Sequence, residues 1–461
     1  MARPRARNEA LVDALREAGL TYARLASEVR AVARTAGEEL RTNKSAVAHW
    51  VGGAEPHPRT TLYVTEAVSR ALGREVSPSE LGFEEPGGED RSRVSLGMCP
   101  GADPVEVLRL IGEADIHRRR LLTNAAYSVA AAGLPLGVEQ AIPGQRRGDS
   151  GDFHAGRSEI EAVREMTRLF TRIDERHGGQ HGRTAVVQYL TTDVARLCRA
   201  SFAREADRAA MLGAAAEVAY LCGWKAYDAG EHGLAQRYQL QAYELTREAG
   251  DEAHQAFVLR ILAHNGMDVR RPEHTLDLAE AALSRVRGRV GPATEALFVV
   301  TLARALANAG RSAEAARRLR VAQDLVLRGD EAELPHWAAL WGSARACVSS
   351  HAAKTVRGMG DHVAAERHYA AAARSRPGPE YQRITALTLA AQGGEQAAMG
   401  HLEQACGTWG RALELLDGVR SARAVDAVDG MRRALAPLRG RGARVAEELD
   451  ERARAWRAAH V

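Results

Sequence analysis

The chain has 461 residues, of which 45% are apolar, 26% charged and only 5% aromatic, and its net charge is +4. A single compact core stops growing at roughly 250 to 300 residues, so this length requires several domains or a repeat array. Abundant alanine and the scarcity of long β-branched runs favour helices over sheets. So small a net charge does not identify a partner.

The five cysteines are far apart, odd in number and without a C-x-x-C pair, which argues against a disulfide framework and a zinc ribbon. Reduced thiols are the expected state. The chain begins without the apolar stretch of a secretory signal, and its longest weakly polar run, residues 125–137, is too short to cross a bilayer. We therefore expect a cytoplasmic protein without membrane contact.

Composition divides the chain into four parts. Residues 1–83 form a compact helical unit, and residues 84–104, rich in Pro, Gly and charge, form a linker. Residues 105–156 are a connecting helical segment, and residues 157–461 are helical almost throughout. The sequence therefore predicts an all-α protein.

A short helix is expected within residues 42–53, which read TNKSAVAHWVGG. Val47 and Trp50 are three residues apart and should face the core. This segment resembles the second helix of the lambda-repressor-like (XRE-type) helix-turn-helix family, which enters the major groove of DNA. The resemblance implies a five-helix head, although the extra stretch 34–41 before the recognition helix leaves its docking geometry open. The outward-facing positions, expected to read bases, are Asn43, Lys44, Ser45, Ala46 and His49.

Two further groups of residues are expected to contact DNA. Arg59 and Thr60 begin the next helix, where backbone donors and the helix dipole favour phosphate. Arg3, Arg5 and Arg7 could enter a minor groove, and a disordered basic tail is the alternative. The alternative for the whole head is a helical protein-interaction module without DNA binding.

Five segments of the second half share one template. A small residue is followed by a turn residue seven positions later, then by a small, a bulky and an alanine position, as in Gly223, Gly230, Ala235, Gln239 and Ala242. The turn positions 230, 270, 310, 360 and 400 are 40, 40, 50 and 40 residues apart, so one copy carries a ten-residue insertion. Small residues allow two helices to pack closely, and Gly ends the first of them in a left-handed conformation.

This pattern resembles the tetratricopeptide repeat (TPR) family across residues 217–418, and similar hairpins are expected back to residue 157. The family's Trp and the Pro at the repeat end are largely missing, and 40 residues exceeds the usual period of about 34. The resemblance implies an α-solenoid of TPR-like helical hairpins behind the head.

In such arrays the first helix of each hairpin lines the concave surface. Cations and aromatic rings gather at these positions, where they would suit an acidic small molecule or an extended peptide. The alternative is that they are solvated charges and ordinary packing aromatics. The predicted ligand-binding residues are Tyr220, Trp224, Tyr227, Arg260, His264, Arg304, Asn308, Lys354 and Arg357.

No catalytic or phosphate-binding motif is present, so we expect neither an enzyme nor a cofactor. His177 and His181, within HGGQHG, indicate an interhelix turn rather than a metal site. The combination of domains resembles quorum-sensing regulators with a TPR domain. It implies a homodimeric, DNA-binding transcriptional regulator that senses a peptide or small molecule, and the alternative is a TPR scaffold that binds another protein.

Overall fold

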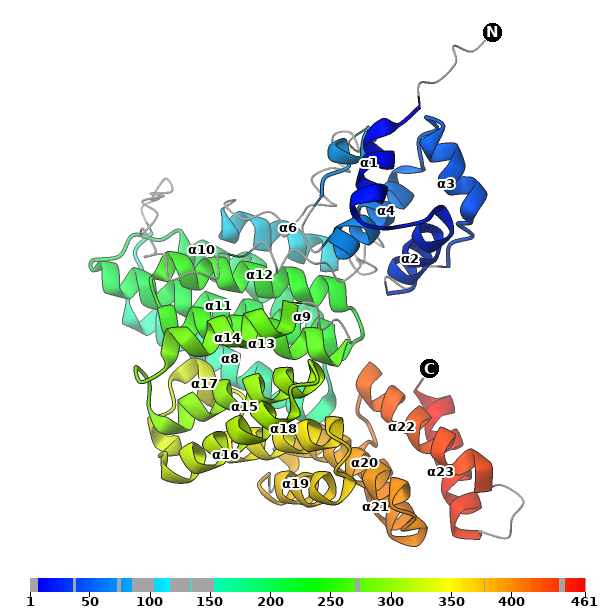
Figure 1. The fold of residues 1–461 in the computed structure, drawn as a ribbon. Coiled ribbons are helices and arrows are strands. Elements are labelled where there is room, and N and C mark those ends of the chain that lie inside the picture. The colour runs from blue at the N-terminus through cyan, green and yellow to red at the C-terminus, as the bar shows by residue number, and fades with distance from the viewer. Residues whose placement is uncertain are drawn as a thin grey trace.

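The structure is a computed structural model that describes residues 7–35, 39–72, 76–84, 103–116, 134, 153–269, 274–376, 378–438 and 444–460. Across these residues the chain is helical and forms no strand, and His154 and Ser201 make one isolated bridge. The all-α prediction is confirmed for this part of the chain (Figure 1). None of the described helices is long and apolar enough to cross a membrane.

The N-terminal head consists of α1 (Glu9–Glu17), α2 (Tyr22–Thr35), α3 (Lys44–Val51), α4 (Pro58–Leu72) and a short 3-10 helix, η1 (Ser79–Leu81). Apolar residues at helical spacing on each of these elements form one common core. Its members include Leu11, Leu15, Leu25, Val29, Val47, Trp50, Val64, Val68 and Leu81.

Asn8 ties the two ends of the head together. Its side-chain oxygen accepts from the Leu11 amide at 3.0 Å and caps α1, while its amide nitrogen donates to the Leu81 carbonyl at 2.9 Å. The Asn8 backbone N–H donates to the Val51 carbonyl, also at 2.9 Å. Gly82 has a φ of 69°, and a Cβ there would lie 2.4 Å from the Asn8 side-chain oxygen. The end of α3 is thus fixed to both ends of the head.

Between the head and the hairpins lie α6 (Pro104–Ile116), α8 (Arg157–His177) and α9 (Arg183–Tyr189). Helix α9 continues through a π-helical turn, η3 (Leu190–Val194), into α10 (Ala195–Cys198). Helix α6 packs on α9, η3 and α12, so part of the connecting segment is helical as predicted. Most of the predicted linker and connecting segment lies outside the described residues.

Six pairs of neighbouring helices follow, and each helix packs mainly on its pair partner. The pairs are α11 (Glu205–Asp228) with α12 (His232–Ala249), α13 (Glu252–Asp268) with α14 (Thr275–Val286), α15 (Pro292–Asn308) with α16 (Ser312–Arg328), α18 (Ala344–Gly358) with α19 (His362–Arg374), α20 (Gln382–Ala398) with α21 (Leu402–Leu415), and α22 (Ala422–Leu435) with α23 (Arg444–Ala459). Consecutive pairs stack in chain order, from green to red in Figure 1.

The glycines of the repeat template end the first helix of four pairs. Gly230, Gly310, Gly360 and Gly400 have φ values of 83°, 77°, 86° and 82°, a region that side chains disfavour. The fifth turn position, Arg270, lies outside the described residues. The predicted left-handed turns are therefore present wherever the template has Gly.

The small positions of the template allow close helix packing. A Cβ at Gly223 would lie 3.0 Å from the Ala235 carbonyl oxygen, and one at Gly393 would lie 2.5 Å from Nε1 of Trp409. The small, bulky and alanine positions of the described copies are buried. Each pair is consequently locked by its own template residues.

The segment before the last helical pair contacts the segment that precedes the first pair. The Arg420 N–H, between α21 and α22, donates to the His177 carbonyl at 2.8 Å. A Cβ at Gly178 would lie 2.3 Å from the Arg420 oxygen. Helix α8 packs mainly against α11, α20 and η6 (Pro379–Tyr381), rather than pairing with α9 as the repeat prediction implied. Through these contacts α8 lies on the inner side of the curved stack, between its first and fifth pairs.

Candidate functional site

Helix α3 presents a polar face to solvent. Val47 is fully buried in the head core and Trp50 nearly so, as predicted from their spacing. In Figure 1, α3 lies on the side of the head that faces away from the helical pairs. The predicted base-reading positions lie opposite the core: Asn43, Lys44, Ser45 and His49 are exposed, and Ala46 is partly buried.

The N-terminus of α3 is held from two sides. The Arg30 guanidinium on α2 donates to the Thr42 carbonyl, and the Asn43 side-chain oxygen accepts from the Ala46 N–H at 3.0 Å. Asn43 is therefore the N-cap of α3, and its amide nitrogen remains as a donor. Helix α2 extends into the predicted extra stretch, whose residues 36–38 are outside the described residues.

The other predicted DNA contacts are only partly described. Thr60 is half-buried near the start of α4, and its N–H donates within a backbone turn. Arg59 lies in the same helical turn, but its side chain is outside the described part. Arg7 is exposed and pairs with an acidic neighbour at 3.4 Å, whereas Arg3 and Arg5 are outside the described residues.

In the helical stack, four predicted ligand residues converge on Asp268. The Tyr227 hydroxyl donates to this carboxylate at 2.6 Å, His264 Nε2 lies 3.0 Å away and Lys354 Nζ 3.1 Å away. Arg304 forms a further ion pair with it. The cations expected to hold an acidic ligand already hold a carboxylate of the chain itself.

Burial and charge set the protonation of this Asp268 cluster. Burial opposes ionisation of Asp268, but the charges of Arg304 and Lys354 outweigh it and hold the pKa of the carboxyl well below its usual range. Burial lowers the pKa of Lys354 to about 8 and that of His264 to about 3, although Asp268 opposes both shifts. His264 is consequently neutral near pH 7, and its Nδ1 lies 3.1 Å from Nε2 of His351.

The remaining predicted ligand cations are also occupied. Arg260 Nε donates to the Leu297 carbonyl at 2.8 Å, and Arg357 pairs with Glu395 at 3.0 Å. Asn308 is exposed at the end of α15, apart from the Asp268 cluster. The structure therefore brings together only part of the predicted set.

The ten-residue insertion covers the aromatic part of the predicted concave surface. It contains η5 (Glu331–Glu333) and α17 (His336–Ala339). The Trp341 ring lies 4.4 Å from that of Tyr220 in an edge contact and 5.6 Å from that of Trp224. The rings of Trp337 and His254 stack at 5.6 Å. The aromatic part of the predicted concave surface is therefore filled by the chain's own side chains.

A buried ion-pair cluster fills the other side of the curve. Arg383 on α20 has no exposed surface, and it donates to Asp174 on α8 and Asp228 on α11 at 2.7 Å each. Lys225 on α11 lies 3.3 Å from the Asp174 carboxylate. These contacts join segments up to 209 residues apart. They fix the curvature of the stack, because α8 sits between its first and fifth pairs.

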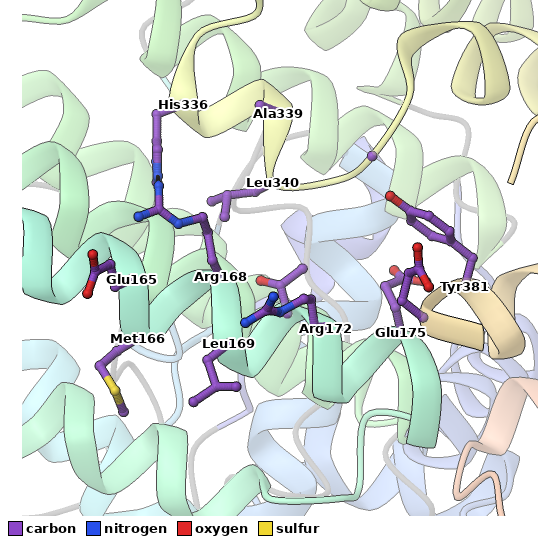
Figure 2. A pocket seen from close by; sticks show the side chains of 13 residues that line it. Glu165, Met166, Arg168, Leu169, Arg172, Glu175, His336, Ala339, Leu340 and Tyr381 are labelled. Atoms are coloured by element: carbon purple, nitrogen blue, oxygen red, sulfur yellow. Dashed lines mark hydrogen bonds between the residues drawn. The ribbon is translucent and has the colours of Figure 1, made fainter. Parts of the chain in front are cut away.

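A pocket lies open beside this filled interior, between α8, α17 and η6 (Figure 2). Its volume is about 930 Å³. Sequence reasoning missed it, since α8 has no template spacing. The insertion's HWAALWG, with two Trp four residues apart, was the available signal that the inserted segment packs inward. Residues of the pocket used below are Leu169, Arg172, Glu175, Leu340 and Tyr381.

His177 is the last residue of α8 and His181 lies in the predicted turn between α8 and α9, with their rings 5.0 Å apart. Across the residues that the structure describes, no group of three or more His, Cys, Asp or Glu side chains is placed to hold a metal ion. Each of the four described cysteines is unpaired, whereas Cys99 lies outside the described residues.

In a comparison with protein families, residues 11–84 match the family described as SP15 N-terminal domain. The matched residues are those of the head, from within α1 to just after η1. No curated protein matches the chain.

Proposed function

We propose that this protein is a sequence-specific DNA-binding transcriptional regulator of the lambda-repressor-like helix-turn-helix type. The observation that supports it best is the polar face of α3, where Asn43, Lys44, Ser45 and His49 are exposed above a buried Val47 and Trp50. A short helix anchored by apolar residues and capped at its N-terminus has the width and the polarity to enter a major groove.

The side chains on this face match what base edges offer. Lys44 donates to the acceptors of guanine, and the free Asn43 amide nitrogen donates to the same edge. His49 lies one turn further along α3 and extends the contact to a neighbouring base pair. One such helix buries too little surface for tight binding at physiological salt, so the proposal includes a homodimer that reads two half-sites.

The helical pairs are proposed to form a TPR-like domain that senses a peptide or small-molecule signal and carries the dimer contacts. The 40-residue template, its buried positions and its left-handed glycines support a repeat array. Because the predicted concave surface is filled, we propose that a signal binds to another surface of this domain.

The test is selection of bound sequences from a random duplex library with the full chain. We expect an enriched motif, and the variant Lys44→Ala with His49→Ala should lose it because each base contact contributes about 1–3 kcal/mol. Arg16→Ala is the matched control, since Arg16 is an exposed cation on α1 that pairs with Asp13. It should enrich the same motif as the natural chain.

The alternative is a TPR scaffold that binds another protein. Under that function no motif would be enriched by the full chain, and the α3 variant would behave like the Arg16 control. Either result would contradict the proposed DNA binding.

A further inference from the structure

The pocket between α8, α17 and η6 contains a carboxylate with an unused oxygen. The Glu175 side chain is 14% exposed, and it pairs with Arg383 through Oε1 at 3.2 Å. Its other oxygen, Oε2, is buried and has no hydrogen-bond partner. A buried acceptor without a donor is unfavourable, so a ligand that donates to this oxygen would remove that cost.

An unpaired cation lies one helical turn away on the same wall. Arg172 is exposed, it lines the pocket, and among the described residues it takes part in no ion pair or hydrogen bond. Residues three apart on a helix share a face, and their separation along its axis is about 4.5 Å. The neighbouring cation Arg168 is already engaged, because its guanidinium lies 3.2 Å from Nε2 of His336.

Beside these charges the lining has an apolar and aromatic part, and it also contains two further carboxylates, Glu165 and Glu380. Leu169 on α8 is 42% exposed, which is unusual for a leucine, and Leu340, on the segment after α17, lines the same pocket. Figure 2 shows Tyr381 next to Glu175 at one end of the pocket. A volume of about 930 Å³ lies within the range of small-molecule sites.

We propose that this pocket binds a small zwitterion with an apolar body, such as an apolar amino acid or a derivative of one. The ligand's ammonium group would donate to Oε2 of Glu175, and its carboxylate would accept from Arg172. Its apolar body would cover Leu169 and Leu340. Two opposite charges about one helical turn apart, beside an apolar wall, are what such a molecule requires.

The pocket touches the two elements that shape the interior. Helix α17 belongs to the insertion that carries Trp337 and Trp341, and α8 carries Asp174. A ligand held between them would bias how α8 and the insertion pack. Any effect of this on DNA binding rests on the proposed function, whereas ligand binding itself does not.

The experiment is calorimetric titration, with saturation-transfer NMR for weak binding, of the full chain with three probes. Phenylalanine carries both charges, N-acetylphenylalanine lacks the ammonium group and phenylalanine amide lacks the carboxylate. We expect phenylalanine to bind and each analogue to bind at least about tenfold more weakly. Glu175→Gln and Arg172→Ala should each weaken the binding of phenylalanine by the same factor. Arg176 is exposed on the same helix but does not line the pocket, so Arg176→Ala should leave this binding unchanged.

Three results would overturn the proposal: no phenylalanine binding, equal binding of all three probes, or binding unchanged in Arg172→Ala. Because Glu175 also pairs with Arg383, its variant is accompanied by a circular dichroism melting curve. The exposed Arg172 variant keeps the test decisive if Glu175→Gln unfolds. Since no DNA is present, failure here leaves the library selection unaffected.

Discussion

Lys44 on α3 and Lys225 on α11 are two of the three lysines of the chain, and they differ in what surrounds them. Lys44 is exposed and has no ion pair among the described residues, whereas Lys225 is fully buried and lies 3.3 Å from Asp174. The third, Lys354, is partly buried and pairs with Asp268. Under the proposed function, a basic residue is available to a partner only where the chain does not already supply an acidic one.

The largest effect should come from breaking the buried ion-pair cluster. Arg383→Met leaves Asp174 and Asp228 short of their shared cation inside the stack, so we expect the free energy of unfolding to fall by about 3–5 kcal/mol. Urea unfolding followed by circular dichroism measures this. Arg374→Met, at an exposed arginine near the end of α19, should change it by less than about 0.5 kcal/mol. If the two variants lowered the free energy of unfolding equally, the buried ion pairs of the stack would contribute no more than an exposed arginine.

The Asp268 cluster offers a smaller version of the same test. Asp268→Asn leaves the cations Arg304 and Lys354 without their carboxylate, and we expect a loss of about 2–3 kcal/mol. Adding Lys354→Met should restore part of this loss, because one unpaired charge disappears. Two losses that simply add would show that Lys354 does not interact with Asp268.

Acid should weaken the helical stack through its buried histidines. Burial lowers the pKa of His254 and of His264 to about 3 from 6.5, so the unfolded chain binds protons between these values while the folded chain does not. The stability that these groups contribute is complete above pH 6.5 and is lost as the pH falls toward 3. In His254→Phe, the loss between pH 6.5 and pH 5 should be about 1–2 kcal/mol smaller. The comparison is made by urea unfolding at each pH, and an unchanged slope would contradict it.

Local features were well predicted from sequence. The spacing of Val47 and Trp50 was enough to assign the buried and exposed faces of α3, because helical geometry fixes which residues share a side. The turn glycines, such as Gly230 and Gly310, were identified by their fixed period for a similar reason. Each of these predictions concerns residues close together in the chain.

The filled interior was not predictable in the same way. A period indicates that hairpins stack, but it does not determine how tightly the stack curves or what enters the curve. Arg383 and Asp174 are 209 residues apart, and α8 follows no template. The predicted ligand cation Arg304 lies on α15, and its partner, Asp268, belongs to the preceding pair. Partner assignment is a long-range property, and the unfilled pocket beside α8 was missed for that reason.

The smallest effect on stability should be at α3, which tests the comparison between Lys44 and Lys225 at the exposed lysine. Lys44→Ala removes an exposed side chain with no ion pair among the described residues, so the free energy of unfolding should change by less than about 0.5 kcal/mol. If Lys44 reads a base, the variant should relax the selected motif at one position and leave the others unchanged. A phosphate contact would instead weaken binding to all sequences and reduce the salt dependence by about one ion. Measuring the affinity for the selected duplex and for its single-base variants, at two salt concentrations, separates these outcomes. A loss of stability as large as that of Asp268→Asn would mean that the face of α3 stabilises the fold and does not bind a partner.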